Sequence, residues 1–403
     1  MDLRKHIAIG LFYFLLVALM GVLLRFFFLT PISLNYKYIL HAHSHTALLG
    51  WIYLGLTTLI YKVFLSKAEK TKHYKRIYIF TNLCIVGMLI TFPIQGYALY
   101  SIIFSTLFLF ASYWFAWFAM KHIPAHFKQR FSWKLIKTAL WYLVISSIGP
   151  WAIGGVMATL GPESIWYKSS IYFYLHFQYN GWFIFALLGI LFYVFEEKGI
   201  KFNPEKLKSF FLLLNFGVLF TVFLSFLWFV PPTVIYVLGL AGAVAQLLAF
   251  SELYSMLKIN FQFLKNEFGP SCLFLLKFAG ILFVLKLFMQ LFSAFPYLAD
   301  LAFRLKDFVI GYLHMVFLGI VITAMLAFLK YFKLILLPKS FFWLYMFAFL
   351  STEVLIFYKA CALWLGLPFV AEYYWLLTIL SCAFPIAVGI LFFRNIKSLY
   401  LSA

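Results

Sequence analysis

Twelve long apolar segments follow one another along this chain, separated only by short polar connections. A helix needs about 20 apolar residues to cross the core of a bilayer, and these segments have that length. Hydrophobic residues make up 65% of the chain, so lipid must surround most of its outward side chains. A segment in lipid must satisfy its own backbone polar groups, which favours helices. We therefore predict an all-α integral membrane protein with helices at 7–29, 40–65, 77–95, 98–120, 135–158, 172–195, 209–230, 232–256, 271–294, 308–331, 340–362 and 371–393.

A six-residue phrase recurs three times along the chain. It reads His45-Thr-Ala-Leu-Leu-Gly50, His176-Phe-Gln-Tyr-Asn-Gly181 and His314-Met-Val-Phe-Leu-Gly319. The histidines lie 131 and 138 residues apart, and such a fixed period indicates an internal repeat. We expect one polytopic membrane domain, residues 1–403, made of three repeats of four helices at about 1–134, 135–270 and 271–403. The phrase then falls on the second helix of each repeat.

The net charge of +20 comes from basic residues that gather in alternate loops. This asymmetry is typical of loops that stay in the cytoplasm, and it places both termini there. The basic loops are then expected to touch anionic lipid headgroups, and we expect no binding to nucleic acid. The first apolar segment has no small-residue cleavage site, so we interpret it as a helix that is retained. The bacterial inner membrane is the expected location.

Histidines lie near the beginning of three predicted helices. His41, His43 and His45 occupy the first turns of the second helix, and His176 and His314 lie at a similar depth on the sixth and tenth. A neutral imidazole is the commonest metal ligand and a standard axial ligand of haem iron. A single histidine at a helix end is more often a hydrogen-bonded or interfacial side chain, but the repetition favours a ligand role. The Gly five residues later leaves a gap for another helix or for a flat macrocycle.

These motifs and the helix count resemble the catalytic subunit of the haem-copper oxidase superfamily, including its nitric oxide reductase branch and the NnrS-type membrane haem proteins. In that family, twelve helices form three arcs of four, with histidine ligands on helices 2, 6 and 10. The resemblance implies a b-type haem held by His314 and by His45, with His41 as the second choice. It implies that His176 binds a copper or other transition metal, and that a cytochrome or a quinol is the redox partner. The cations Arg25 and Arg304 are candidates to pair with haem propionates.

The chain departs from the family pattern at three places. The segment 209–230 has no histidine where the oxidases have a pair, and the tenth helix has only His314 where they have two. Asn180 stands where the oxidases often have Tyr and the nitric oxide reductases Glu. A complete binuclear centre is therefore not expected. What remains is one haem between the second and tenth helices, or one metal held by imidazoles, for which the candidates are His45, His176, His314 and His43.

Two charged residues lie near the middle of predicted membrane helices. Lys286 is on the ninth helix and Glu353 on the eleventh. An isolated charge in a bilayer is costly, so we expect either a mutual ion pair or a proton path. Gln246 and Gln290 are weaker indications of the same kind.

Three functional hypotheses stay open at this stage. The first is a membrane haem or metal protein, an oxidoreductase in one version, that transfers electrons or binds and reduces O2 or nitric oxide. The second is a secondary transporter, although three parallel repeats differ from the inverted or twofold repeats of that class. The third is an assembly or sensor protein that binds haem or copper in transit.

Overall fold

The computed structural model describes residues 2–66, 68 and 70–401, and every regular element in them is a helix. Twelve of these described helices are long and apolar enough to cross a membrane, and each predicted segment falls on one of them. The class of all-α membrane protein is thereby confirmed. The spans are Leu3–Phe26, Tyr36–Leu65, Thr71–Gln95, Leu99–His122, Phe131–Thr159, Ile165–Glu197, Pro204–Phe229, Thr233–Ile259, Phe261–Ser293, Lys306–Tyr331, Lys339–Leu365 and Tyr373–Leu401.

The chain divides into two compact units, which are described separately here. Unit 1 comprises Met1–Pro124 and Phe328–Ala403, and unit 2 comprises Ala125–Ala327. The first boundary is close to the predicted repeat boundary at 134, whereas the predicted boundary at 270 lies inside unit 2. The division into one domain with three repeats stays a prediction.

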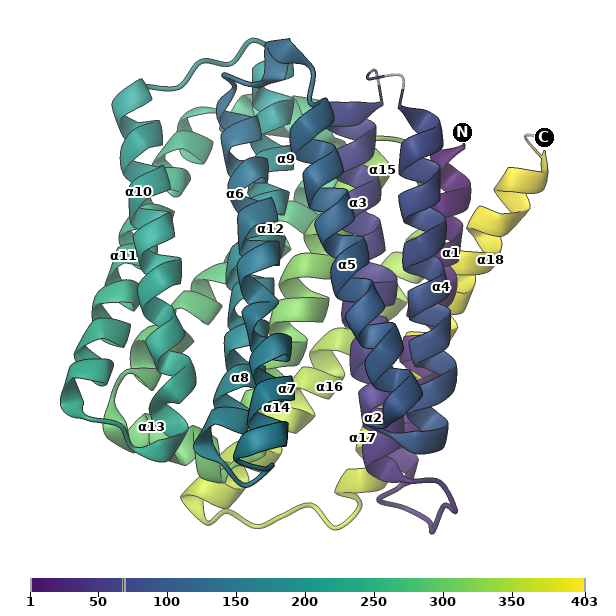
Figure 1. The fold of residues 1–403 in the computed structure, drawn as a ribbon, viewed down its shortest axis with the longest axis vertical. Coiled ribbons are helices and arrows are strands. Elements are labelled where there is room, and N and C mark those ends of the chain that lie inside the picture. The colour runs from purple at the N-terminus through teal and green to yellow at the C-terminus, as the bar shows by residue number, and fades with distance from the viewer. Residues whose placement is uncertain (1, 67, 69, 402–403) are drawn as a thin grey trace. The chain divides into compact units, whose positions relative to one another are not determined.

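Unit 1 contains the first four spans and the last two. Within it, the long helices α4 and α5 run side by side, and α1 packs against α18 (Figure 1). Its elements are α1 (Leu3–Phe26), α2 (Tyr36–His45), η1 (Thr46–Tyr53), α3 (Leu54–Ile60), η2 (Tyr61–Leu65), α4 (Thr71–Gln95), α5 (Leu99–His122), α16 (Lys339–Leu365), α17 (Tyr373–Ser381) and α18 (Ala383–Leu401).

Unit 2 contains the middle spans, and its helices α10 and α11 pack along one another (Figure 1). The helix α15 (Thr323–Tyr331) crosses the boundary between the units. The elements of unit 2 are η3 (Ala125–Phe127), α6 (Phe131–Ser146), α7 (Ile148–Thr159), α8 (Ile165–His176), η4 (Phe177–Phe183), α9 (Ile184–Glu197), α10 (Pro204–Thr221), η5 (Val222–Phe229), α11 (Thr233–Ile259), α12 (Phe261–Ser293), α13 (Pro296–Arg304), α14 (Lys306–His314) and η6 (Met315–Ile322).

Short polar side chains fix where several helices begin. Asp2, Asn35, Ser164 and Asn203 each accept a hydrogen bond from a backbone N–H in the first turn of α1, α2, α8 and α10. These caps satisfy N–H groups that have no partner inside the helix. The short helix α13 was not predicted, because its nine residues are too few to cross a bilayer and its sequence is amphipathic.

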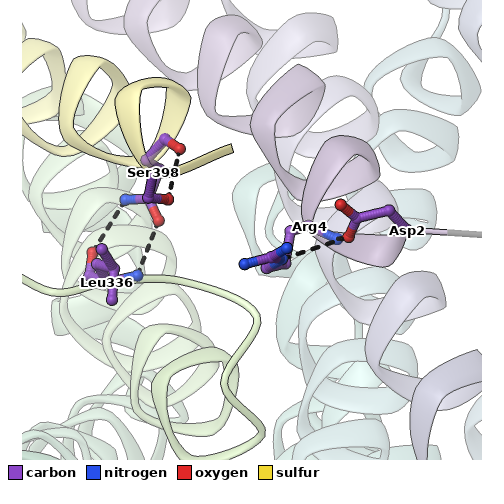
Figure 2. A network of polar contacts seen from close by, with 5 residues as sticks. Asp2, Arg4, Leu336 and Ser398 are labelled. Carbon is purple, nitrogen blue, oxygen red and sulfur yellow. Dashed lines mark hydrogen bonds and ion pairs between the residues drawn. The ribbon is translucent and has the colours of Figure 1, made fainter. Parts of the chain in front are cut away.

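One amide ties the end of the chain to a loop in unit 1. Asn395 on α18 accepts a hydrogen bond from the Leu336 N–H at 2.8 Å and donates one to the Leu336 carbonyl at 2.9 Å. Figure 2 shows this clamp beside Ser398, and shows Arg4 bonded to Asp2 at the start of α1. The loop before α16 therefore has its backbone held by a buried side chain.

Candidate functional site

Each of the three repeated histidines is the last residue of an α-helix that continues as a π-helix. The π-helical segments are η1 after His45, η4 after His176 and η6 after His314. A π-helix is rare, holds an extra residue per turn and is frequent at functional sites. A second π-helical segment, η2, follows further along the span of His45. The repeated phrase thus has the same local backbone in all three places.

His45 is held in one orientation by hydrogen bonds to both ring nitrogens. Its Nδ1 lies 2.9 Å from the His41 carbonyl, which can only accept, so Nδ1 carries the proton. Its Nε2 therefore accepts a hydrogen bond from the hydroxyl of Tyr97 at 3.1 Å. His41 lies on the same helix face, with its ring 4.6 Å from that of Tyr97. His43 points elsewhere and donates from Nδ1 to the Val17 carbonyl on α1 at 3.0 Å, as the spacing predicts.

His314 has the same local geometry as His45. Its Nδ1 donates to the carbonyl of Ile310 at 2.8 Å, four residues earlier on α14. Since the two ring nitrogens lie on opposite sides of the imidazole, Nε2 faces away from this backbone contact. Arg304, which we considered as a partner for propionates, forms an ion pair with Asp300 one turn earlier on α13.

His176 differs from the other two, because its Nε2 atom, and not its Nδ1 atom, donates to a backbone carbonyl, and that carbonyl is on another helix. Nε2 donates to the Val218 carbonyl on α10 at 2.8 Å, and Nδ1 accepts from the Asn180 amide at 3.1 Å. The side chain is only 1% exposed. Binding a metal would require it to lose one of these buried hydrogen bonds, which is costly.

A buried lysine continues the hydrogen bonds of His176. Lys286 on α12 donates to the Oδ1 atom of Asn180 and, at 3.2 Å, to the Oε1 atom of Gln246. Gln246 on α11 in turn donates to the hydroxyl of Thr221 at 2.7 Å. We call His176, Asn180, Lys286, Gln246 and Thr221 the polar arch. It joins four membrane helices of unit 2 through side chains that are all buried.

Glu353 on α16 has a different environment. It is 7% exposed, and neither of its carboxyl oxygens has a hydrogen-bond partner among the described residues. The Arg25 side chain at the end of α1 acts on it electrostatically, and acts on His43 as well. Glu353 is in unit 1 and Lys286 in unit 2, so the expected ion pair between them stays a prediction.

Packing around the phrase also recurs. A Cβ atom placed on Gly50 would lie 3.1 Å from the Cβ of Tyr13, and one on Gly181 would lie 2.6 Å from the Cβ of Tyr142. Tyr13 lies on α1 and Tyr142 on α6, and each of these helices comes just before the helix that carries the phrase in the first and second predicted repeat. The gap at each Gly is therefore filled by a neighbouring helix, which is one of the two uses that the sequence suggested.

The same two tyrosines reach a third helix. Tyr13 donates to the Oδ1 atom of Asn82 on α4 at 3.1 Å, and Tyr142 donates to the Oδ1 atom of Asn215 on α10 at 3.0 Å. Each Asn donates its amide to the carbonyl four residues earlier, at 2.8 and 2.7 Å. The steps from Tyr to Tyr and from Asn to Asn are 129 and 133 residues, close to the 131 between the histidines.

At the positions that correspond to these partners, the third predicted repeat has other residues. His176 and His314 lie 138 residues apart, and the same step leads from Tyr142 to Gly280 and from Asn215 to Glu353. Gly280 has open space where a side chain would begin. Glu353, whose carboxyl oxygens have no hydrogen-bond partner in the described part of the chain, therefore occupies the position at which α4 and α10 carry a hydrogen-bonded Asn.

The structure brings together some of the predicted site residues and not others. His176 and Lys286 belong to one network in unit 2, which also contains Gln246, and His41 lies beside His45 in unit 1. Among residues 2–66, 68 and 70–401, no three His, Cys, Asp or Glu side chains form a group that could hold a metal ion. His45 is in unit 1 and His314 in unit 2, so a haem shared by these two residues stays a prediction.

Sequence reasoning missed several residues of these networks. Thr221, Tyr97 and the Tyr–Asn pairs were not singled out, because Tyr and Thr are ordinary in membrane helices. One signal was available for Asn82 and Asn215, whose separation is close to the period of the phrase. The chain matches no family model and no curated protein.

Proposed function

We propose that this chain is a membrane haem protein, distantly related to the haem-copper oxidases, that transfers electrons or binds a diatomic gas. The observation that carries the proposal is the shared geometry of His45 and His314. Each has its Nδ1 proton bonded to a carbonyl four residues earlier, and each is followed by a π-helix. Metal-binding imidazoles are typically oriented in this way by a hydrogen bond from the other nitrogen.

The residues present fit a haem better than a three-histidine metal site. In His45 and His314 the proton is on Nδ1, so Nε2 is the nitrogen with the lone pair, whereas His176 has its proton on Nε2 and donates it to the Val218 carbonyl. A bound haem would supply one-electron chemistry and an iron that can bind a gas. The chain would provide His45 and His314 as ligands, and Tyr97 would exchange its bond to His45 Nε2 for another partner. Arg25 would provide positive charge in the same unit.

The local bond alone does not distinguish a ligand. His122, at the end of α5, also donates from Nδ1 to a carbonyl four residues earlier, at 3.0 Å. It lies in a basic connection, and no π-helix follows it. His45 and His314 are distinguished from His122 by having both this hydrogen bond and a π-helix directly after them. His122 therefore provides a matched control.

A threefold repeat is part of the proposal. The recurring π-helices, the Tyr side chains packed on Gly50 and Gly181 and their bonds to Asn82 and Asn215 support it. Such a repeat suits the three arcs of four helices found in the oxidases. The third repeat has diverged at positions 280 and 353, and the chain lacks the ligands of a complete binuclear centre.

The test is a pair of visible spectra, oxidised and dithionite-reduced, of the purified chain in detergent. We expect a Soret band, and its loss or shift in His45→Ala and in His314→Ala. His122→Ala should keep the spectrum of the unchanged chain. A full chromophore in both ligand variants would refute the assignment, as would a colourless protein after expression with added haem.

A secondary transporter is the second candidate, and one observation favours it. Two members of the polar arch, His176 and Thr221, line a cavity in unit 2, and the arch contains the buried Lys286; transporters keep ionisable groups inside their membrane helices. A colourless protein that moves a solute into vesicles, and loses this uptake in Lys286→Met, would support this candidate over the haem protein.

A further inference from the structure

Unit 1 contains a cavity of about 150 Å³ that the proposed function does not use. Three segments form its walls: the first turns of α1, the loop between α15 and α16, and the end of α18. Figure 2 shows the Arg4 side chain extending from α1 toward the side on which Leu336 and Ser398 lie, and all three residues line the cavity. A cavity of roughly 150 Å³ can hold a molecule of the size of benzene, so a phosphate group fits as well.

The charge around this cavity is strongly positive. Arg4 and Lys333 line it, and its lining in the described part of the chain contains no Asp or Glu. Asp2 contacts the Nε atom of Arg4 at 3.4 Å in an ion pair that water reaches, and such a pair contributes little. Asp2 is also the one acidic residue in the sequence of the segments 2–11, 330–339 and 391–401, which carry Lys or Arg at positions 4, 5, 330, 333, 339, 394 and 397. The cavity therefore favours an anionic ligand.

The backbone at Lys333 has a conformation that is unfavourable for a lysine. Its φ angle is +57°, in the left-handed region where Gly is usual. Lys333 closes the end of α15, because its N–H donates to the Lys330 carbonyl at 3.0 Å and the next N–H donates to the Leu329 carbonyl at 2.8 Å. Helices that end in this way commonly have Gly at this position. A lysine is strained there relative to Gly, which indicates that its side chain has a use.

The wall changes from charged to apolar along α1. Arg4, Ile7, Ala8 and Leu11 line the cavity from one face of this helix, because they are three or four residues apart. Leu11 lies roughly 10 Å further along the helix axis than Arg4, at 1.5 Å per residue. A phospholipid has the same order, with its phosphate at the membrane surface and its chains in the hydrocarbon core. The loop and α18 add apolar wall at positions 334, 335, 336 and 399.

We propose that this cavity binds the phosphate group of one anionic phospholipid. Arg4 and Lys333 are its cationic partners, and the acyl chains run along the apolar face of α1 into the bilayer. The planar guanidinium of Arg can donate two parallel hydrogen bonds to a phosphate, and Lys adds a point charge. The clamp between Asn395 and Leu336 joins α18 to the loop and so fixes two of the three walls.

Such a site differs from the general attraction of basic loops to a membrane surface. Lys and Arg at helix ends often reach the headgroups singly, whereas here a cavity between three segments gives one lipid a fixed place. A soluble phosphate compound has the same anionic group but no acyl chains. The site contains none of the histidines proposed as haem ligands, so it stands whatever the visible spectra show.

Native mass spectrometry of the full chain in detergent tests the proposal, because it counts the molecules bound at each concentration. Dioctanoyl phosphatidylglycerol is the anionic probe, dioctanoyl phosphatidylcholine has the same chains but no net charge, and glycerol phosphate has no chains. We expect one phosphatidylglycerol molecule to bind at least about fivefold more tightly than either of the others. Equal affinity for the two lipids would overturn the proposal. Glycerol phosphate that binds as tightly as phosphatidylglycerol would overturn the lipid assignment and would indicate a soluble phosphate compound.

Two variants locate the bound lipid. Arg4→Gln and Lys333→Gln should each weaken phosphatidylglycerol about fivefold and leave phosphatidylcholine nearly unchanged. Arg76→Gln and Lys72→Gln are matched controls, since they remove the same charges from exposed positions on α4 in unit 1, outside the cavity lining. Both controls should keep the affinity of the unchanged chain. Unchanged affinity in both cavity variants, or an equal loss in the controls, would overturn the proposal.

The variant Lys333→Gly separates binding from folding. Because Gly adopts the left-handed conformation without strain, this variant should keep or raise the unfolding temperature in lipid-free detergent. It also removes the ammonium group, so it should still weaken phosphatidylglycerol about fivefold. A stable Lys333→Gly protein that binds the lipid as tightly as the unchanged chain would overturn the proposal. If Arg4→Gln fails to fold, Lys333→Gly and the comparison of the three probes still decide.

Discussion

At the scale of single residues, Lys286 is the least expected side chain in unit 2. Its ammonium group has no carboxylate partner among the described residues, and its two contacts are amide oxygens of Asn180 and Gln246. Those amides are themselves oriented by His176 and Thr221. Each member of the polar arch thus depends on the others, as expected for buried polar networks.

This dependence predicts non-additive effects on stability. Lys286→Met leaves two buried amide oxygens without a donor, and should lower the free energy of unfolding by about 2–4 kcal/mol. Gln246→Leu should cost about 1–3 kcal/mol, but adding it to Lys286→Met should cost little more. Thermal unfolding in detergent measures all three variants. Gln262→Leu, on the exposed side of α12, should have almost no effect. Strictly additive losses would contradict a connected arch.

The contact between Tyr97 and His45 leads to a second prediction at this scale. Because Tyr97 donates to the nitrogen that would bind iron, it competes with the haem of the proposed function. Tyr97→Phe should therefore keep the haem and tighten its binding about two- to tenfold, as measured by haem transfer to apomyoglobin. Loss of haem in Tyr97→Phe would show instead that the hydroxyl supports the haem.

Sequence alone indicated the three histidines but not their different roles. The spacing placed His41 and His45 on one face, and the structure agrees. It could not show that the Nε2 atom of His176 donates to the Val218 carbonyl, since that carbonyl is provided by the backbone of another helix. The sequence does not show which backbone carbonyls accept hydrogen bonds from side chains. For this reason His176 looked equivalent to His45.

At the scale of elements, the two glycines of the phrase differ in how tightly a neighbour packs on them. Tyr142 approaches Gly181 more closely than Tyr13 approaches Gly50. A Cβ atom added to Gly181 would lie 2.6 Å from the Cβ of Tyr142, and one added to Gly50 would lie 3.1 Å from the Cβ of Tyr13. Both tyrosines are also held at their hydroxyl by an Asn, so they cannot easily withdraw. Helix pairs that pack through a Gly tolerate little added volume.

We therefore expect a graded response to Ala. Gly181→Ala should lower the free energy of unfolding by about 2–3 kcal/mol and Gly50→Ala by about 1 kcal/mol. Gly154→Ala on α7, where nothing lies within 4 Å, should be neutral or stabilising by up to about 1 kcal/mol. Unfolding temperatures in one detergent give the ranking. A Gly50→Ala variant less stable than Gly181→Ala would contradict these contacts.

The π-helical segments mark the limit of sequence reasoning at this scale. The twelve apolar segments predicted twelve helices, because a bilayer leaves the backbone few alternatives. Nothing in the composition of Thr46–Tyr53 or Met315–Ile322 distinguishes a π-helix from an α-helix. Hydropathy is the same for both, and the difference depends on packing with neighbouring helices. Only the repetition of the phrase indicated that these places were unusual.

At the scale of the whole molecule, the distribution of basic loops predicts the orientation in the membrane. The connection after η2 should lie in the cytoplasm, and the connection between α1 and α2 on the opposite side. Ser66 and Leu34 are exposed residues in these two connections. Of the native thiols, Cys84 and Cys272 are buried and Cys361 and Cys382 are half-buried, so labelling of the unchanged chain gives the background.

One added cysteine at a time tests this orientation directly. In intact spheroplasts, a membrane-impermeant maleimide should label Leu34→Cys and leave Ser66→Cys unlabelled. After the membrane is dissolved in detergent, both variants should react. The reverse pattern in spheroplasts would contradict the predicted topology.

The clamp of Asn395 on Leu336 sets where the chain can be shortened or joined to a reporter. A chain that ends after Ser398 keeps the clamp, whereas one that ends after Arg394 loses both bonds to the loop before α16. The point variant Asn395→Ala should cost about 1–3 kcal/mol and make the loop sensitive to protease. A fluorescent fusion attached after Ser398 should therefore report expression faithfully, and one attached before Asn395 should report a damaged protein.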